Sequence, residues 1–106
     1  MALGLTTEQR GDEVHIRLSG ELDAGTAGEF KSAVEQAAAA APKKLVLFVD
    51  ELLFMASAGL RILIFAKQKM GAGVDIYVIG AKGPVLGTLQ MSGFHRAVYL
   101  KDSWVG

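Results

Sequence analysis

The alternation of apolar and polar residues near the amino terminus predicts a strand that is buried on one face only. In residues 14–18, apolar side chains occupy every second position and polar side chains lie between them, which is typical of a half-buried strand. Leu3 and Leu5 begin an earlier strand, which turns back at residues 10–12. We therefore expect the chain to start with a pair of strands.

A helix is predicted to follow over residues 24–41, after the second strand closes at residues 20–23. Asp23 stands where an acidic residue can cap the first turn of this helix. The apolar positions recur at helical spacing and are Phe30, Ala33, Val34, Ala37 and Ala41. Pro42 ends the helix, because proline cannot continue its hydrogen bonding.

The remaining chain alternates between strand and helix patterns. Residues 45–49 form a continuous apolar run that ends at Asp50, as expected of a central strand covered on both faces. A helix, a strand, a helix and a strand are then predicted over residues 57–70, 74–79, 84–93 and 97–100. The order β-β-α-β-α-β-α-β indicates an α/β layer fold with a mostly parallel or mixed sheet and helices packed on it.

Composition and charge limit the function classes. The 106 residues are 51% hydrophobic, which suits one domain spanning residues 1–106. The absence of cysteine excludes disulfides and thiolate chemistry and fits a cytoplasmic protein. Eleven basic and eleven acidic residues cancel, so we expect no direct nucleic-acid partner. The amino terminus lacks a signal-peptide pattern, and charged residues interrupt the longest apolar stretch, so no membrane span is expected.

Catalytic and metal-binding patterns are missing, so we expect neither an enzyme nor a cofactor. The only histidines, His15 and His95, have no partner at ligand spacing, and we expect both to be ordinary surface residues. The segment around Ser57 lacks the first glycine of the G-x-S-x-G nucleophile elbow. Binding is therefore a better hypothesis than catalysis.

Ser57 stands at a loop-to-helix junction, just before an apolar helical run. One interpretation is a helix N-cap, which serine commonly provides. The other is a phosphorylation site, because unpaired N–H groups and the positive end of the helix dipole favour a phosphate there. Position alone favours the N-cap.

The predicted helix over residues 57–70 has apolar residues on two faces. Leu60, Leu63, Ile64 and Lys67 would share the face that packs on the sheet, while Ile62 and Phe65 lie on another, with Arg61 beside them. Either Phe65 packs under a neighbouring helix, or Ile62 and Phe65 form an exposed patch for a protein partner.

Four segments resemble the STAS domain family, and within it the anti-sigma-factor antagonists. They occur in the family's order over nearly the whole chain and cover residues 18–23, 45–50, 54–60 and 89–94. The resemblance implies a four- or five-stranded sheet with helices mainly on one face. It also implies partner switching, in which the antagonist binds an anti-sigma factor that is a serine kinase, and phosphorylation of a serine ends the complex.

By this resemblance Ser57 is the phosphorylated serine, a serine phosphatase resets it, and the loop at residues 20–23 completes a docking surface with the second helix. The expected partner-binding residues are Glu21, Asp23, Ala56, Ser57, Ala58, Gly59, Arg61, Ile62 and Phe65. The family's signature has an aspartate and a hydroxyl residue where this chain has Ala56 and Ala58. A scaffolding module that docks without phosphorylation is therefore an alternative, and a small-ligand sensor is another.

Overall fold

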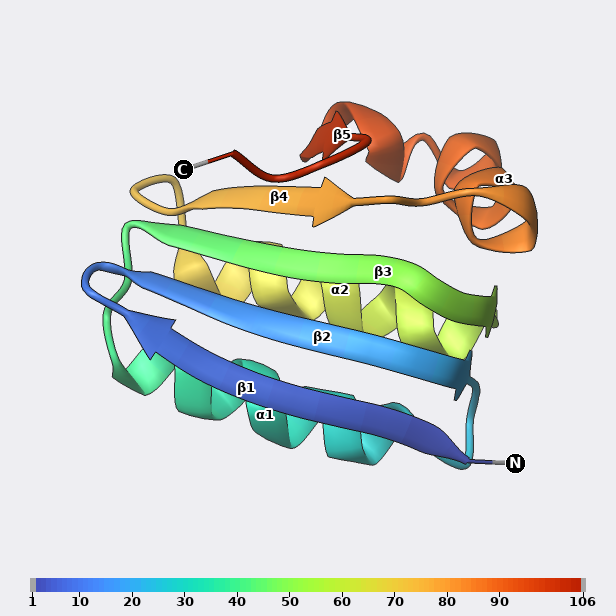
Figure 1. The fold of residues 1–106 in the computed structure, drawn as a ribbon, viewed down its shortest axis with the longest axis horizontal. Helices are drawn as coiled ribbons and strands as arrows, with labels where there is room; N and C mark the ends of the chain where they lie inside the picture. The colour runs from blue at the N-terminus through green and yellow to red at the C-terminus, as the bar shows by residue number, and fades with distance from the viewer. Residues whose placement is uncertain (1, 106) are drawn as a thin grey trace.

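The computed structural model describes residues 2–105 as an α/β layer structure in which the strands and helices follow the predicted order (Figure 1). The elements are β1 (Leu3–Arg10), β2 (Glu13–Leu22), α1 (Ala27–Ala39), β3 (Lys44–Met55), α2 (Ser57–Met70), β4 (Asp75–Ile79), α3 (Gly83–Ser92), the 3₁₀ helix η1 (Phe94–Arg96) and β5 (Tyr99–Lys101).

The sheet is mixed and its strands lie in the order of the sequence, β1-β2-β3-β4-β5. The hairpin of β1 and β2 is antiparallel, whereas β2, β3, β4 and β5 are mutually parallel neighbours. Each parallel crossover carries a helix or a helical segment, as parallel strands require. Because β2 and β3 are parallel, the loops that follow them, which lead into α1 and α2, lie at the same edge of the sheet.

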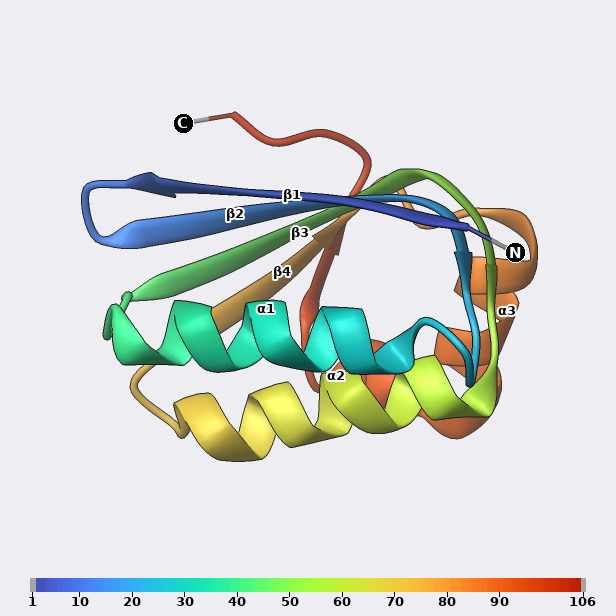
Figure 2. The ribbon, with the colours of Figure 1, turned by 90° about the horizontal axis from the view of Figure 1, so that it is seen from below.

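The helices cover one face of the sheet (Figure 2). Alternate residues of β2, among them Val14, Ile16 and Leu18, point to that side and join a core that includes Phe30 of α1 and Leu63 of α2. All five are no more than 2% exposed. The alternation predicted a strand with one buried face, and its apolar side chains do form the main core.

The other face of the sheet carries a smaller apolar cluster. Val46, Phe48 and Ile79 are its buried members, with Tyr77 and Trp104 packed against them. The carboxyl-terminal segment reaches this side by leaving β5 and lying on the side away from the helices (Figure 2). All of residues 45–49 are buried, so the prediction that this strand is covered on both faces is confirmed.

Some element boundaries differ from those predicted. The first helix begins at Ala27 and ends at Ala39, so Ala41 lies outside it with a φ of 49°. Pro42 accounts for this end, because proline disfavours helical geometry in the residue before it. The last strand starts at Tyr99 rather than at residue 97, because residues 97 and 98 form the turn that follows η1. Among residues 2–105, no helix is long and apolar enough to cross a membrane.

Candidate functional site

The loop between β2 and α1 is held in one conformation by hydrogen bonds within itself. The Thr26 hydroxyl accepts from the Asp23 backbone N–H at 2.9 Å and donates to the Glu21 carbonyl at 3.0 Å. The Asp23 carboxylate accepts from the backbone N–H groups of Gly25 at 2.9 Å and Thr26 at 3.1 Å. These bonds form a compact turn before the helix, so Thr26 rather than Asp23 is the N-cap residue of α1.

This loop is fastened to the junction between β3 and α2. The Ala56 backbone N–H donates to the Leu22 carbonyl at 2.8 Å, and the Thr88 hydroxyl of α3 donates to the Met55 carbonyl at 3.1 Å. Gly59 allows the close approach, since a Cβ atom on it would lie 2.6 Å from Cγ of Leu22. Residues 20–22, predicted as part of a loop, are the end of β2. The structure brings them and the loop after them close to the start of α2, as the family resemblance implied.

Ser57 is the first residue of α2 and its side chain is exposed. Ala56 occupies the N-cap position and provides no side-chain hydrogen bond, so the N-cap interpretation of Ser57 is wrong. Within residues 2–105 the Ser57 hydroxyl has no hydrogen-bond partner, and the first turn of α2 contains no acidic residue. Among the described residues, the backbone N–H groups of Ser57 and Ala58 have no acceptor, whereas the Gly59 N–H donates to the Ala56 carbonyl at 3.0 Å. A negative group on Ser57 would therefore be stabilised by the two free N–H groups and by the helix dipole.

The nine predicted partner-binding residues differ in accessibility. Ser57 and Arg61 are exposed and Gly59 is buried, while the half-buried members are Glu21, Asp23, Ala56, Ala58, Ile62 and Phe65. Arg61 follows Ser57 by four residues, so both lie on the same side of α2. Among the described residues, Arg61 forms no ion pair. Its guanidinium is therefore available to a partner.

The packing face of α2 differs from the predicted one. Its buried residues are Gly59, Leu63 and Ala66, whereas Ile64 is 40% exposed. Phe65 packs against the core, and the Lys31 ammonium of α1 lies 5.2 Å from its ring centroid. Phe65 therefore fits the alternative of packing beside a neighbouring helix. The helix is therefore rotated relative to the prediction, and at Gly59 its backbone lies too close to the Leu22 side chain to leave room for a Cβ atom.

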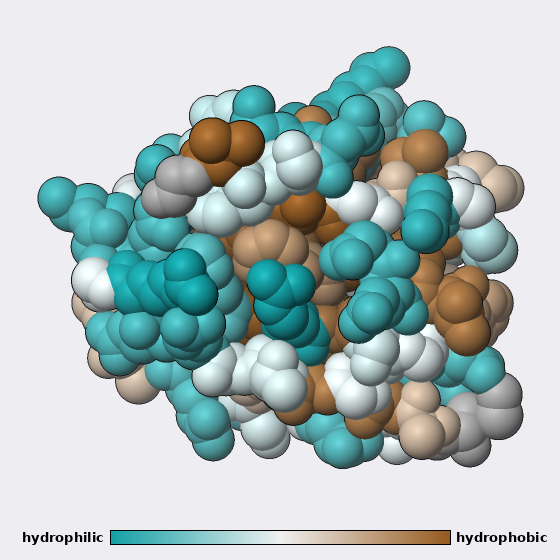
Figure 3. All heavy atoms as spheres, in the orientation of Figure 1, coloured by the Kyte–Doolittle hydropathy of each residue, from teal (hydrophilic) through white to brown (hydrophobic). Residues whose placement is uncertain are grey.

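The sequence patterns did not indicate that three apolar residues are exposed. Leu53 and Phe54, at the end of β3, are 70% and 42% exposed, and Met91 of α3 is 91% exposed. Figure 3 shows apolar side chains at the end of the molecule where β3 finishes. Phe54 is the register partner of Glu21, so it extends the surface beside Ser57. The signal available was the apolar run after Asp50 and Glu51, which continues the strand to Met55.

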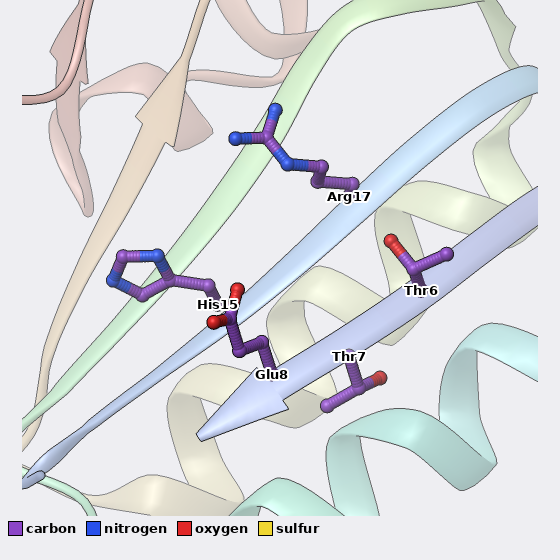
Figure 4. A pocket seen from close by; sticks show the side chains of 5 residues that line it. All are labelled: Thr6, Thr7, Glu8, His15 and Arg17. Carbon is purple, nitrogen blue, oxygen red and sulfur yellow. The ribbon is translucent and has the colours of Figure 1, made fainter. Parts of the chain in front are cut away.

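The face of the sheet away from the helices contains a shallow hollow with ionisable side chains (Figure 4). Its lining comes from β1 and β2 and consists of Thr6, Thr7, Glu8, His15 and Arg17. Glu8 is bound to Arg10, whose hydrogen bond lowers the pKa of the Glu8 carboxyl and raises the pKa of the guanidinium. Among residues 2–105, no group of three or more histidine, aspartate and glutamate side chains could hold a metal ion.

The expectation that His15 is a surface residue is wrong. It is 6% exposed, and its Nε2 atom lies 2.9 Å from Oε1 of Glu13. The rings of Phe48 and Trp104 pack against it, with centroids 5.4 and 6.0 Å away. Sequence alternation placed His15 on the polar face of β2 and had no means of showing that the carboxyl-terminal segment covers that face. His95 is half-buried.

Comparisons with known proteins find matches that extend over nearly the whole chain. The STAS domain model matches residues 5–104. An anti-sigma factor antagonist from Mycobacterium paratuberculosis has a similar structure, with a TM-score of 0.88 and 25% identity over 96% of this chain and 87% of that chain. SpoIIAA in its unphosphorylated form has a TM-score of 0.74 and 20% identity over 97% and 90% of the two chains.

The phosphorylated form of SpoIIAA from Bacillus gives a TM-score of 0.72 and 21% identity over 96% of this chain and 92% of that chain. These last two likenesses concern the fold. The match of the family model extends over nearly all described residues and includes the loop after β2 and the start of α2. The chain therefore belongs to the STAS domain family.

Proposed function

We propose that this chain is an anti-sigma-factor antagonist that binds an anti-sigma factor with serine kinase activity and is released from it when Ser57 is phosphorylated. The observation that carries the proposal is the exposed Ser57 at the first position of α2, whose hydroxyl has no partner among the described residues. The similarity to the Mycobacterium paratuberculosis antagonist supports the general role. The role is regulatory, and the chain itself catalyses nothing.

The rigidity of the surrounding backbone supports a docking surface at this edge. The Glu21–Thr26 and Leu22–Ala56 hydrogen bonds hold the two loops before a partner arrives, which lowers the ordering cost of binding. Ser57, Arg61 and Phe54 then present a hydroxyl, a guanidinium and an aromatic ring to the partner. Aromatic and arginine side chains are the types most enriched where interfaces contribute binding energy.

A phosphate on Ser57 would change this surface in two ways. It adds close to two negative charges where the docked partner would have to exclude water. It also lies one helical turn from Arg61 and can attract the guanidinium that the partner would otherwise contact. Both effects weaken the complex, so the proposal requires a kinase that acts on Ser57 and a serine phosphatase that reverses the reaction.

The test compares binding of the wild type with Ser57→Asp and Ser57→Ala. Each protein is used to capture an anti-sigma serine kinase from lysate of the source organism, and the affinity of the purified kinase is then measured by calorimetry. We expect Ser57→Ala to bind like the wild type and Ser57→Asp to bind at least about tenfold more weakly, a loss of about 1.4 kcal/mol. Ser32→Asp, on the exposed side of α1, controls for added charge.

Phosphorylation itself is tested by incubating the purified kinase and ATP with the wild type and locating the phosphate by mass spectrometry. Modification of Ser57, and none of Ser57→Ala, supports the switch. Equal affinity of the wild type and Ser57→Asp would instead favour a phosphorylation-independent interaction module. Ala56 and Ala58 favour that second candidate, because neither flanking side chain provides a polar group for a kinase to recognise.

A further inference from the structure

The segment after β5 lies over the small apolar cluster on the sheet face away from the helices, and we call residues 102–105 the strap. Its aromatic and cation–π contacts come from one side chain. The Trp104 ring packs edge-on against Tyr77, with centroids 4.8 Å apart, and against His15 at 6.0 Å. The Lys44 ammonium lies 5.7 Å from the indole centroid. Val105, in contrast, is 88% exposed.

The backbone of the strap is not fastened to the sheet. The last backbone hydrogen bond at this end joins the Gly80 N–H to the Lys101 carbonyl at 2.9 Å. Among the described residues, no hydrogen bond or ion pair involves residues 102–105. A hollow of about 300 Å³ remains beside the strap, lined by Lys44, Tyr77, Lys101, Ser103, Trp104 and Val105. The strap therefore lacks both ladder bonds and close packing along its length.

The polar N–H group of the Trp104 indole is in an unfavourable environment. This Nε1–H is buried and has no hydrogen-bond acceptor among residues 2–105, although buried indole N–H groups usually have one. A buried donor without an acceptor costs on the order of 1–3 kcal/mol, and this cost offsets part of the gain from burying the indole ring. Opening the strap would return the N–H to water without breaking any backbone hydrogen bond.

We propose that the strap is releasable, that the Trp104 side chain alone closes it, and that its opening bares a second apolar surface formed by Val46, Phe48 and Ile79. This surface lies on the side of the sheet away from α1 and α2, so it is separate from the surface proposed around Ser57.

The single tryptophan of the sequence makes the opening measurable by hydrogen exchange followed by NMR. The β3 amides of Val46 and Phe48 serve as the closed-core reference. We expect the indole N–H of Trp104 to be at least about a hundredfold less protected from exchange than these amides. Low urea should accelerate the β3 amides and leave the indole rate unchanged, because a local opening exposes little surface. Equal protection of the indole N–H and the β3 amides, with the same dependence on urea, would overturn the proposal.

A second measurement uses the dye ANS, which binds exposed apolar surface. Trp104→Ala should keep the circular dichroism of the wild type and bind more ANS. Val105→Ala is the matched control within the strap, because that side chain is already exposed, and it should bind no more dye than the wild type. If Trp104→Ala were unfolded, Trp104 would be a core residue. If it were folded but bound no more ANS than the wild type, removing the indole would expose no apolar surface. Either result contradicts the releasable strap.

Discussion

The edge of the sheet around Ser57 and the strap at residues 102–105 are opposite in construction. Around Ser57 the backbone is fixed, because the Leu22 carbonyl accepts from the Ala56 N–H at 2.8 Å, while the serine hydroxyl has no hydrogen-bond partner in the part of the chain that the structure describes. In the strap the backbone is unbonded among the described residues, while the Trp104 side chain is packed against other rings.

Taken together, the two proposals separate recognition from mobility within one small domain. A surface built on fixed loops presents its side chains in one arrangement, which favours binding to a specific partner. A segment held by one side chain can open without disturbing the rest of the fold. We therefore expect substitutions in the loops around Ser57 to affect stability and docking together, whereas substitutions in the strap should affect neither strongly.

The largest effect is expected at Gly59, where the loops meet the start of α2. A Cβ atom there would lie 2.6 Å from Cγ of Leu22, which is fully buried. Gly59→Ala should therefore lower the free energy of unfolding by about 2 kcal/mol, because overpacking outweighs the better helix propensity of alanine. Urea unfolding followed by circular dichroism measures the loss.

Gly87 of α3 is the matched control for this substitution. A Cβ atom at Gly87 would meet nothing within 4 Å, so Gly87→Ala should leave stability unchanged or raise it by up to about 1 kcal/mol. If both alanine variants were as stable as the wild type, the packing at Gly59 would have room for a side chain and the close approach to Leu22 would not require glycine.

A smaller effect is expected at Thr26, which organises the loop after β2. Its side chain is 5% exposed and bonds to Glu21 and Asp23. Thr26→Val keeps the shape but leaves the Glu21 carbonyl and the Asp23 N–H without this partner, so stability should fall by about 1 kcal/mol. Ser32→Ala, at an exposed site of α1, should change it by less than about 0.5 kcal/mol. Unchanged loop resonances in the NMR spectrum of Thr26→Val would contradict the organising role.

Periodicity predicted the elements well where burial decides the residue type. The α2 boundaries, the element order and the two-sided burial of residues 45–49 follow from short-range patterns, because a helix or strand buries residues at its own period. The extension of β3 to Met55 was missed, since Asp50 and Glu51 interrupt the apolar run. Their polar side chains are exposed there without ending the strand.

The site was predictable in position but not in detail. Parallel strands place the loops after β2 and β3 at one edge, so the proximity of Leu22 and Ala56, which are joined by a hydrogen bond, could be expected. The rotation of α2 could not, because it depends on the close approach of Gly59 to Leu22, which is distant in sequence. The burial of His15 depends in the same way on Trp104, which is 89 positions further along the chain (104 − 15).

The smallest effect is expected from the Glu8–Arg10 pair, which tests whether charge matters equally everywhere on the surface. Both side chains are exposed, and the hydrogen bond from Arg10 lowers the pKa of Glu8 below its ordinary value of 4.5. A carboxyl whose pKa is lower in the folded state stabilises the protein above its unfolded pKa, and this contribution is lost as the pH falls through the folded value.

Glu8→Gln should therefore make stability slightly less dependent on pH below about 5, and the wild type and variant should become equally stable at the acid end of the titration. Because the pair is exposed, salt should reduce the difference further.

Glu8 also lies on the sheet face opposite the helices, so Glu8→Gln should bind the kinase like the wild type. Arg61→Gln removes a positive charge beside Ser57 and should bind the kinase more weakly. Equal affinity of Arg61→Gln and Glu8→Gln, measured by calorimetry at low salt, would mean that the guanidinium of Arg61 does not take part in docking.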